Sequence, residues 1–159
     1  MKTLSRKVSP ALLSLGLVLF TANVTAEPAS HRDLAKEEAN RQLVIHFYNQ
    51  FFNQHKVEQA AKVLAEDYIQ HNPDVPDGKA PLLDYFEGYF KTHPQSRADI
   101  VRSATDNDLV FLHVHSVENA DDRGQAVVDI FRVENGVIVE HWDVIQAVPE
   151  TSANDNTMF

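Results

Sequence analysis

The sequence predicts a single α+β domain in which helices come first and an antiparallel sheet follows. Apolar residues recur with a helical period in the chain up to about residue 92. From residue 98 onwards apolar and polar residues alternate instead, as in strands with one buried face. Helices followed by an antiparallel meander are typical of α+β folds. We expect the sheet to curve around the helices and to enclose a cavity, the usual place for a small ligand.

Residues 1–26 have the pattern of a signal peptide. Lys2, Arg6 and Lys7 form a positively charged start, residues 11–22 are almost entirely apolar, and small residues end the segment. The apolar run is too short for a comfortable membrane span, which takes about 20 residues. The sequence therefore predicts export, to a bacterial periplasm or out of the cell. An uncleaved N-terminal anchor is the alternative.

The rest of the chain is expected to form one domain over residues 27–148, with a flexible polar tail over residues 149–159. The chain has no cysteine, so burial alone has to stabilise the domain. Its net charge of −9 becomes −12 without the three basic residues of the signal peptide. This charge repels phosphate backbones and anionic lipids, which argues against nucleic-acid or membrane partners.

The expected helices and loops follow one another in the first half of the chain. Residues 33–54 read as a long amphipathic helix, and residues 57–65 as a shorter one. A short extended segment over residues 67–73 ends at a proline, and residues 74–78 form a loop that contains Pro and Asp-Gly. A third helix is predicted over residues 79–92.

The second half of the chain is expected to hold the strands of the meander. Strands are predicted over residues 98–104, 109–118 and 125–134. Asn135-Gly136 is a strong hairpin signal, and it introduces a last strand that runs to Gln146.

The last strand carries the candidate catalytic residues. Side chains alternate along a strand, so one face is expected to hold Val137, Val139, His141, Asp143 and Ile145. Loss of hydration on an apolar face raises the pKa of a carboxylate toward the range of a useful general base. Asp143 is therefore the candidate base for proton abstraction next to a carbonyl, with His141 or a tyrosine stabilising the enolate. The alternative is a buried structural ion pair of His141 and Asp143.

Further ionisable residues are expected to line the same pocket if the faces of the strands converge. The candidates are one acid and two histidines of the middle strands, and two residues of the short extended segment: Asp129, His113, His115, Tyr68 and His71. Each has a structural alternative. The histidines could lie at the rim, Asp129 could hold a neighbouring residue, and His71 could stabilise the turn before Pro73.

Metal and covalent chemistry find little support. His113-Val114-His115 with a distant histidine is a metal-ligand pattern, but the glycine and proline spacing of metal-binding barrels is absent. We therefore expect no metal and no cofactor. The sequence also has no cysteine, no Gly-x-Ser-x-Gly motif and no glycine-rich phosphate loop.

The segments 68–73, 77–78, 129–136 and 140–144 together resemble the SnoaL-like proteins of the nuclear-transport-factor-2-like superfamily. The resemblance implies a cone-shaped α+β roll of cystatin-like type, with a bent antiparallel sheet around a long helix and a homodimer formed through the sheet. Characterised SnoaL-type members are polyketide cyclases that catalyse an intramolecular aldol condensation without metal or organic cofactor. Carried onto this chain, the resemblance makes Asp143 the general acid/base, His141 its companion in the pocket and His71 a further pocket residue.

Three functions remain open from the sequence. The first is a cofactor-independent lyase or isomerase that acts on a small carbonyl compound. The second is a periplasmic protein that binds a small ligand in the same pocket without chemistry. The third is an interaction domain whose sheet face, around Trp142, docks a partner.

Overall fold

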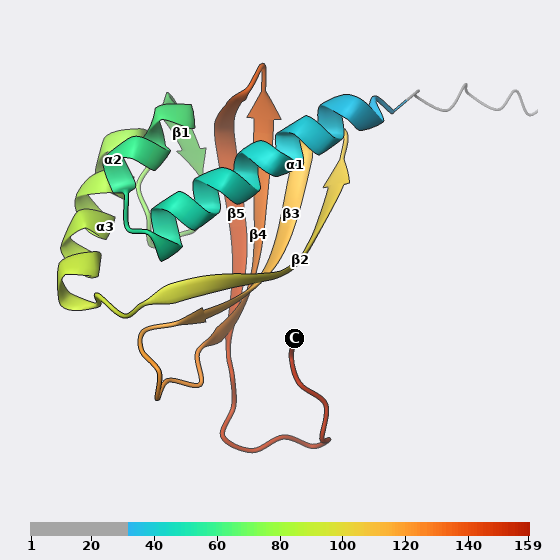
Figure 1. The fold of residues 1–159 in the computed structure, drawn as a ribbon. Helices are drawn as coiled ribbons and strands as arrows, with labels where there is room; N and C mark the ends of the chain where they lie inside the picture. Colours follow the sequence, from blue (N-terminus) through green and yellow to red (C-terminus); the bar gives the residue numbers. More distant parts are fainter. Residues whose placement is uncertain (1–31) are drawn as a thin grey trace, which may run out of the picture. The chain divides into compact units, whose positions relative to one another are not determined.

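The computed structural model describes residues 32–159 and confirms the α+β class, with an open, curved sheet packed against helices (Figure 1). The predicted signal peptide, residues 1–26, lies outside the described residues. The helical elements are α1 (Leu34–Tyr48), continued by a π-helical turn (Asn49–Asn53), then α2 (Val57–Ala60), continued by a 3-10 turn (Ala61–Val63), and α3 (Lys79–Thr92). The strands are β1 (Leu64–Gln70), β2 (Arg97–Asp106), β3 (Leu109–Val117), β4 (Gln125–Glu134) and β5 (Val137–Ala147).

Helix α1 begins at an Asp33 cap and crosses the concave face of the sheet. The Asp33 side chain accepts a hydrogen bond from the Lys36 backbone N–H at 3.0 Å, which satisfies one of the free donors of the first turn. Val44 and Phe51 are completely buried against the sheet, as the predicted apolar stripe requires. The helical path ends at His55, whose φ of 52° lies in the left-handed region.

The segment after this helix differs from the prediction. A helix is predicted over residues 57–65, but α2 ends at Ala60 and strand β1 already begins at Leu64. Leu64 pairs in parallel with Ile138 of β5, and both side chains are buried. Pairing with the sheet therefore outweighs the helical preference of this short segment.

The sheet has the strand order β1-β5-β4-β3-β2, with β1 parallel to β5 and all other neighbours antiparallel. The predicted hairpin turn between β4 and β5 is confirmed, since Asn135 and Gly136 both have positive φ, at 50° and 80°. The parallel pairing of β1 with β5 is not contained in the predicted meander. It brings the loop after β1 beside the middle of β5, where His71 N donates to His141 O at 2.9 Å.

A β-bulge in β5 changes which residues face inward. Arg132 pairs with Glu140 while its neighbour Val133 pairs with Ile138, so Val139 is the extra residue. Ile138, rather than Val137 or Val139, is therefore the buried residue at this end of the strand. Beyond the bulge the predicted alternation holds, and His141 and Asp143 face the helices.

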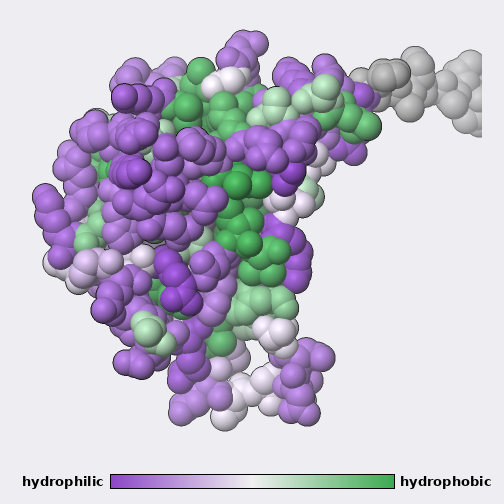
Figure 2. Space-filling model, in the orientation of Figure 1, coloured by the Kyte–Doolittle hydropathy of each residue, from purple (hydrophilic) through white to green (hydrophobic). Residues whose placement is uncertain are grey.

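Aromatic side chains fill much of the space between the sheet and the helices. Phe51 of the π-helical turn contacts Phe86 and Phe90 of α3 at ring-centroid distances of 5.1 and 6.2 Å. Figure 2 shows hydrophilic side chains over most of the visible face, with hydrophobic ones gathered over the strands beside α1. Within residues 32–159, no helix is both long and apolar enough to cross a membrane.

Candidate functional site

A cavity of about 480 Å³ lies between the concave face of the sheet, α1, α3 and the loop after β1. Most of its wall is apolar and aromatic, with residues from both helices and from the sheet, among them Phe47, Phe52, Phe86, Phe90, Phe131 and Val127. One group of polar lining residues lies on β1, the loop after it, β4 and β5: Tyr68, Gln70, Asn72, Asp129, His141 and Asp143. Other polar residues line the cavity elsewhere: Ser96, Arg97, Ser116, Glu118 and Gln125. A mostly apolar wall with a few grouped polar residues is typical of small-molecule sites.

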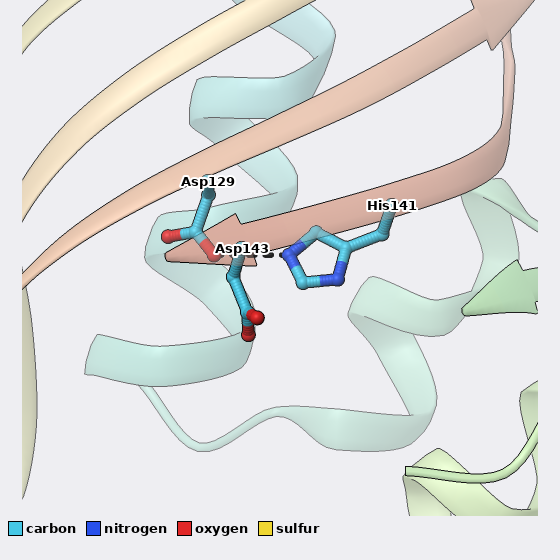
Figure 3. A group of neighbouring side chains, drawn as sticks. All are labelled: Asp129, His141 and Asp143. Atoms are coloured by element: carbon cyan, nitrogen blue, oxygen red, sulfur yellow. Dashed lines mark hydrogen bonds and ion pairs between the residues drawn. The ribbon is translucent and has the colours of Figure 1, made fainter. Parts of the chain in front are cut away.

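Strands β4 and β5 bring three ionisable side chains together on the inner face of the sheet (Figure 3). Asp129 and Asp143 are direct cross-strand partners, and His141 is two residues before Asp143 on the same face. Asp129 and His141 are buried, whereas Asp143 is half-buried. The sequence predicts that these three residues share an interior, and the structure places them there.

Asp129 is held on both of its carboxylate oxygens. The Tyr48 hydroxyl of α1 donates to Oδ2 at 2.7 Å, and Nε2 of His141 lies 2.9 Å from Oδ1. These contacts offset the loss of hydration that a buried carboxylate suffers. From the sequence, Tyr48 belongs only to the apolar stripe of the first helix. Its pairing with a residue 81 positions away cannot be read from that periodicity.

The last residue of β1 and the loop after it supply two amide side chains to the site. Gln70 Oε1 lies 2.8 Å from Nδ1 of His141. Asn72 Nδ2 donates to Oδ2 of Asp143 at 2.7 Å, while Asn72 Oδ1 accepts from the Asp74 backbone N–H. Asn72 is a site residue that the sequence prediction missed. The signal that could have found it is its place one residue before Pro73, in the segment that also holds Tyr68 and Gln70.

Two tyrosines of the site keep their hydroxyl protons. Burial raises the pKa of Tyr48 well above its ordinary value, and the nearby Asp129 carboxylate adds to this. Burial likewise raises the pKa of Tyr68, with Asp129 and Asp143 as the charged neighbours. Tyr68 lines the cavity, and within residues 32–159 its hydroxyl has no hydrogen-bond partner, so it is available as a donor.

His113 and His115 do not line this cavity, and their prediction as pocket residues is wrong. On β3 the completely buried residues are Val110, Leu112 and Val114, which turn the two histidines to the opposite face of the sheet. There the His115 ring stacks on the C-terminal Phe159 at 4.2 Å, and His113 lies 5.8 Å from the same ring. The alternation of side chains along the strand predicts that the two histidines share a face. It does not predict which face of the sheet the helices cover.

His71 also lies outside the cavity, in contrast to the prediction. Its ring stacks on Trp142 at 4.6 Å, and its Nε2 lies 2.7 Å from Glu140. Glu140 and Trp142 flank His141 on β5 and therefore point to the other face. His71 directly follows Gln70, and the turn of the chain at this point sends the two side chains apart.

The group of Asp129, His141 and Asp143 has the residue types of a metal site, with ligand atoms within 4.8 Å of one another. However, Asp129 and His141 already use all their side-chain polar atoms in hydrogen bonds. An ion would have to replace the bond between them or the one from Gln70. The donor set therefore fits a hydrogen-bonded pair better than a metal, and we assign no metal to it.

Comparisons with known proteins agree with this architecture. The family model of the SnoaL-like domain matches residues 44–141. The chain is similar to the crystal structure of a putative ketosteroid isomerase from Kribbella flavida, with a TM-score of 0.62 and 20% identity over 75% of this chain and 86% of that one. It is also similar to AclR, a putative hydroxylase from Streptomyces galilaeus, with a TM-score of 0.59 and 20% identity over 69% and 90% of the two chains.

A SnoaL-like protein of unknown function from Burkholderia thailandensis aligns with a TM-score of 0.60 and 12% identity, over 70% of this chain and 97% of that one. At such identities, the likeness to solved structures establishes the fold. The search of curated proteins gave no match.

Proposed function

Because this chain belongs to the SnoaL-like family, we propose that its cavity binds a small carbonyl compound and that Asp143 removes a proton from the carbon next to the carbonyl. The reaction would be that of a cofactor-independent lyase or isomerase, of the aldol-condensation or polyketide-cyclase type. The single observation that carries the proposal concerns the three ionisable side chains of the site. Of these three, Asp143 is the one that lines the cavity with a carboxylate oxygen that has no hydrogen-bond partner within residues 32–159.

The hydrogen bonds divide the three groups into two roles. Asp129 and His141 have every side-chain polar atom engaged by Tyr48, Gln70 or each other. Asp143 accepts from Asn72 on Oδ2, and within residues 32–159 no donor occupies its Oδ1. A base has to come within hydrogen-bond distance of the proton that it abstracts, and Asp143 alone offers a free acceptor for that contact.

Tyr68 supplies the second group that such a reaction needs. When Asp143 takes the proton, the electron pair of the broken C–H bond moves toward the carbonyl oxygen and forms an enolate. Tyr68 lines the same cavity, and its protonated hydroxyl can donate a hydrogen bond to that oxygen. In an isomerisation, a different carbon of the conjugated enolate then takes the proton back from Asp143. In an aldol condensation, the α-carbon attacks a second carbonyl within the same substrate, and the resulting alkoxide takes the proton from Asp143.

In this scheme His141 acts on Asp129 rather than on the substrate. Both of its ring nitrogens are engaged, so neither can donate to an enolate without giving up a contact. This differs from the sequence hypothesis that His141 itself stabilises the enolate.

The test is exchange of the proton on the α-carbon for deuterium. It is measured on the substrate, so the product does not have to be known. The protein is incubated in D₂O with a panel of small cyclic and aromatic ketones, and loss of the α-proton signal is followed by NMR. We expect exchange with at least one ketone, and we expect Asp143→Asn to slow it by at least about 100-fold, the usual contribution of a general base. Asp84→Asn, on the exposed side of α3, is the matched control and should exchange at the wild-type rate.

The scheme would be contradicted if Asp143→Asn, shown to be folded by circular dichroism, exchanged as fast as the wild type. The second candidate function is ligand binding without chemistry. It is favoured by the apolar wall and by the Asp129–His141 pair, whose side-chain polar atoms are all engaged within the protein. In that case ligands would raise the melting temperature of wild type and Asp143→Asn alike, with no exchange in either.

The assembly and location of the protein complete the proposal. Val128 and Val144 are cross-strand partners on the outer face of the sheet, and both are exposed, so we expect a second copy of the chain to cover this face. The composition of residues 1–26 supports export to the periplasm or outside the cell. Export would also mean that the carbonyl compound is met outside the cytoplasm.

A further inference from the structure

Gln70 accepts two hydrogen bonds on one amide oxygen. The backbone N–H of Asn72 donates to Oε1 at 3.1 Å, and Nδ1 of His141 lies 2.8 Å from the same oxygen. The first contact fixes which way the amide faces. If it were reversed, its NH₂ group would meet the N–H of Asn72, two donors with no acceptor between them.

The fixed amide decides the state of one ring nitrogen of His141. An amide oxygen can only accept, so Nδ1 of His141 has to carry a hydrogen. Without that hydrogen, two lone pairs would face each other at 2.8 Å in a buried part of the protein. The contact therefore excludes the neutral histidine that is protonated on Nε2 alone.

The other ring nitrogen then shares a single proton with Asp129. Nε2 lies 2.9 Å from Oδ1, and with no hydrogen between them two acceptors would repel each other. A single proton, on Nε2 of His141 or on Oδ1 of Asp129, removes this repulsion. The pair is an imidazolium with a carboxylate, or a neutral imidazole with a carboxylic acid, and its total charge is zero in both forms. The Tyr48 hydroxyl, which stays protonated, donates to the other oxygen of Asp129 in either form.

We propose that Gln70 is a positioning residue that locks the proton on Nδ1 of His141 and thereby keeps the His141–Asp129 pair electrically neutral. Without Gln70, Nδ1 would be free to lose its proton. His141 could then donate from Nε2 to an ionised Asp129, which would give the pair a charge of −1. The groups that face His141 are Gln70 and Tyr68 of β1, Asp129 and Phe131 of β4, and Asp143 on its own strand.

The consequence for chemistry rests on the proposed function of Asp143. A neutral pair beside Asp143 leaves one negative charge at the site, so the base acts without a second ionised acid next to it. A pair with a charge of −1 would place two negative charges on neighbouring strands, which opposes the ionised form of Asp143. Gln70 would thus set the charge at the site through its hydrogen bond to His141.

The test is the protonation state of the His141 ring, read from long-range ¹H–¹⁵N spectra of the ¹⁵N-labelled protein across pH. In the wild type we expect Nδ1 in the range of a protonated nitrogen at every pH at which the protein is folded. In Gln70→Leu we expect the Nδ1 resonance to move to the unprotonated range as pH rises. Gln70→Glu keeps an oxygen acceptor and should retain the wild-type signal at Nδ1.

Gln59→Leu, on the exposed side of α2, is the control for the substitution itself and should leave the His141 resonances unchanged. An unprotonated Nδ1 in the wild type, or a Gln70→Leu spectrum identical to it, would overturn the proposal. If Gln70→Leu does not fold, the wild-type and Gln70→Glu spectra still decide. None of these spectra needs a substrate. If the exchange assay contradicted the role of Asp143 as a base, the spectra would still test the role of Gln70.

Discussion

Asp129 is a carboxylate with 5% of its surface exposed, in a wall made mostly of aromatic rings. Such a group is tolerated because each oxygen has its own partner, a phenol on one side and an imidazole on the other. The partners come from α1 and β5, so the Asp129 side chain connects that helix to that strand. Removal of either partner leaves a buried acceptor unpaired.

Tyr48→Phe is expected to lower the free energy of unfolding by about 2 kcal/mol, because it deletes the donor to the buried Asp129. Urea unfolding followed by fluorescence measures the loss. Tyr85→Phe makes the same chemical change on a side chain that is 59% exposed, and it should stay within about 0.5 kcal/mol of the wild type. Equal effects of the two variants would mean that the Tyr48–Asp129 bond contributes no net stability.

At the scale of elements, the sequence predicted β2 to β5 and α3 well because each carries a strong local signal. Helix α3 has the bounds that were predicted, and the Asn135-Gly136 turn is where it was expected. The bulge at Val139 has no such signal, since a one-residue insertion leaves the composition of β5 unchanged. It was therefore Ile138, and not the predicted Val137 and Val139, that proved to face the core.

The site was predicted in part for the same reason. Alternation along one strand correctly grouped His141 with Asp143. Asp129 lies opposite Asp143 because the bulge at Val139 shifts the β4–β5 register by one residue, whereas the short turn alone would pair Asp129 with Trp142. The face of β3 could not be assigned this way, and His113 and His115 were placed inside. Tyr48 and Asn72 reach the site from far along the chain. Such contacts depend on how the elements pack, which local periodicity does not contain.

Glu37 connects α1 to β2 and gives this contact a dependence on pH. It accepts from Arg32 Nε at 2.7 Å and from the Thr105 hydroxyl at 2.8 Å, and Arg32 also donates to Thr105 O. The hydrogen bonds from Arg32 lower the pKa of Glu37 from 4.5 to about 2, against the burial that would raise it. A folded-state pKa below the unfolded one adds stability that is complete above pH 4.5 and is lost as pH falls toward 2.

Glu37→Gln should therefore melt at a lower temperature than the wild type at neutral pH, and the difference should shrink between about pH 5 and pH 2. Melting curves by circular dichroism across this range measure the effect. Glu58→Gln, at an exposed position of α2, is the control and should follow the wild-type curve. A difference that stays constant with pH would show that the ionised form of Glu37 does not stabilise this contact.

At the scale of the whole molecule, the outer face of the sheet should be an interface between two copies. Val144 is 68% exposed in the middle of β5, an unusual place for an apolar side chain in an isolated domain. Analytical ultracentrifugation of the wild type should give twice the mass of one chain, and Val144→Lys should shift the equilibrium to the monomer. Leu34→Lys is the matched control, because Leu34 is also 68% exposed but lies at the start of α1. A wild-type monomer at every concentration would contradict the proposed dimer.

The parallel pairing of β1 with β5 has a consequence for the order in which the protein matures. Gln70 and His141 are register partners, so the site joins strands that are 71 residues apart in the chain. Contacts of this separation form late, after the local hairpins. During synthesis, the base and its supporting amides cannot meet until β5 has left the ribosome. A chain that folds from its N-terminus would thus acquire its reactive centre as one of its last steps.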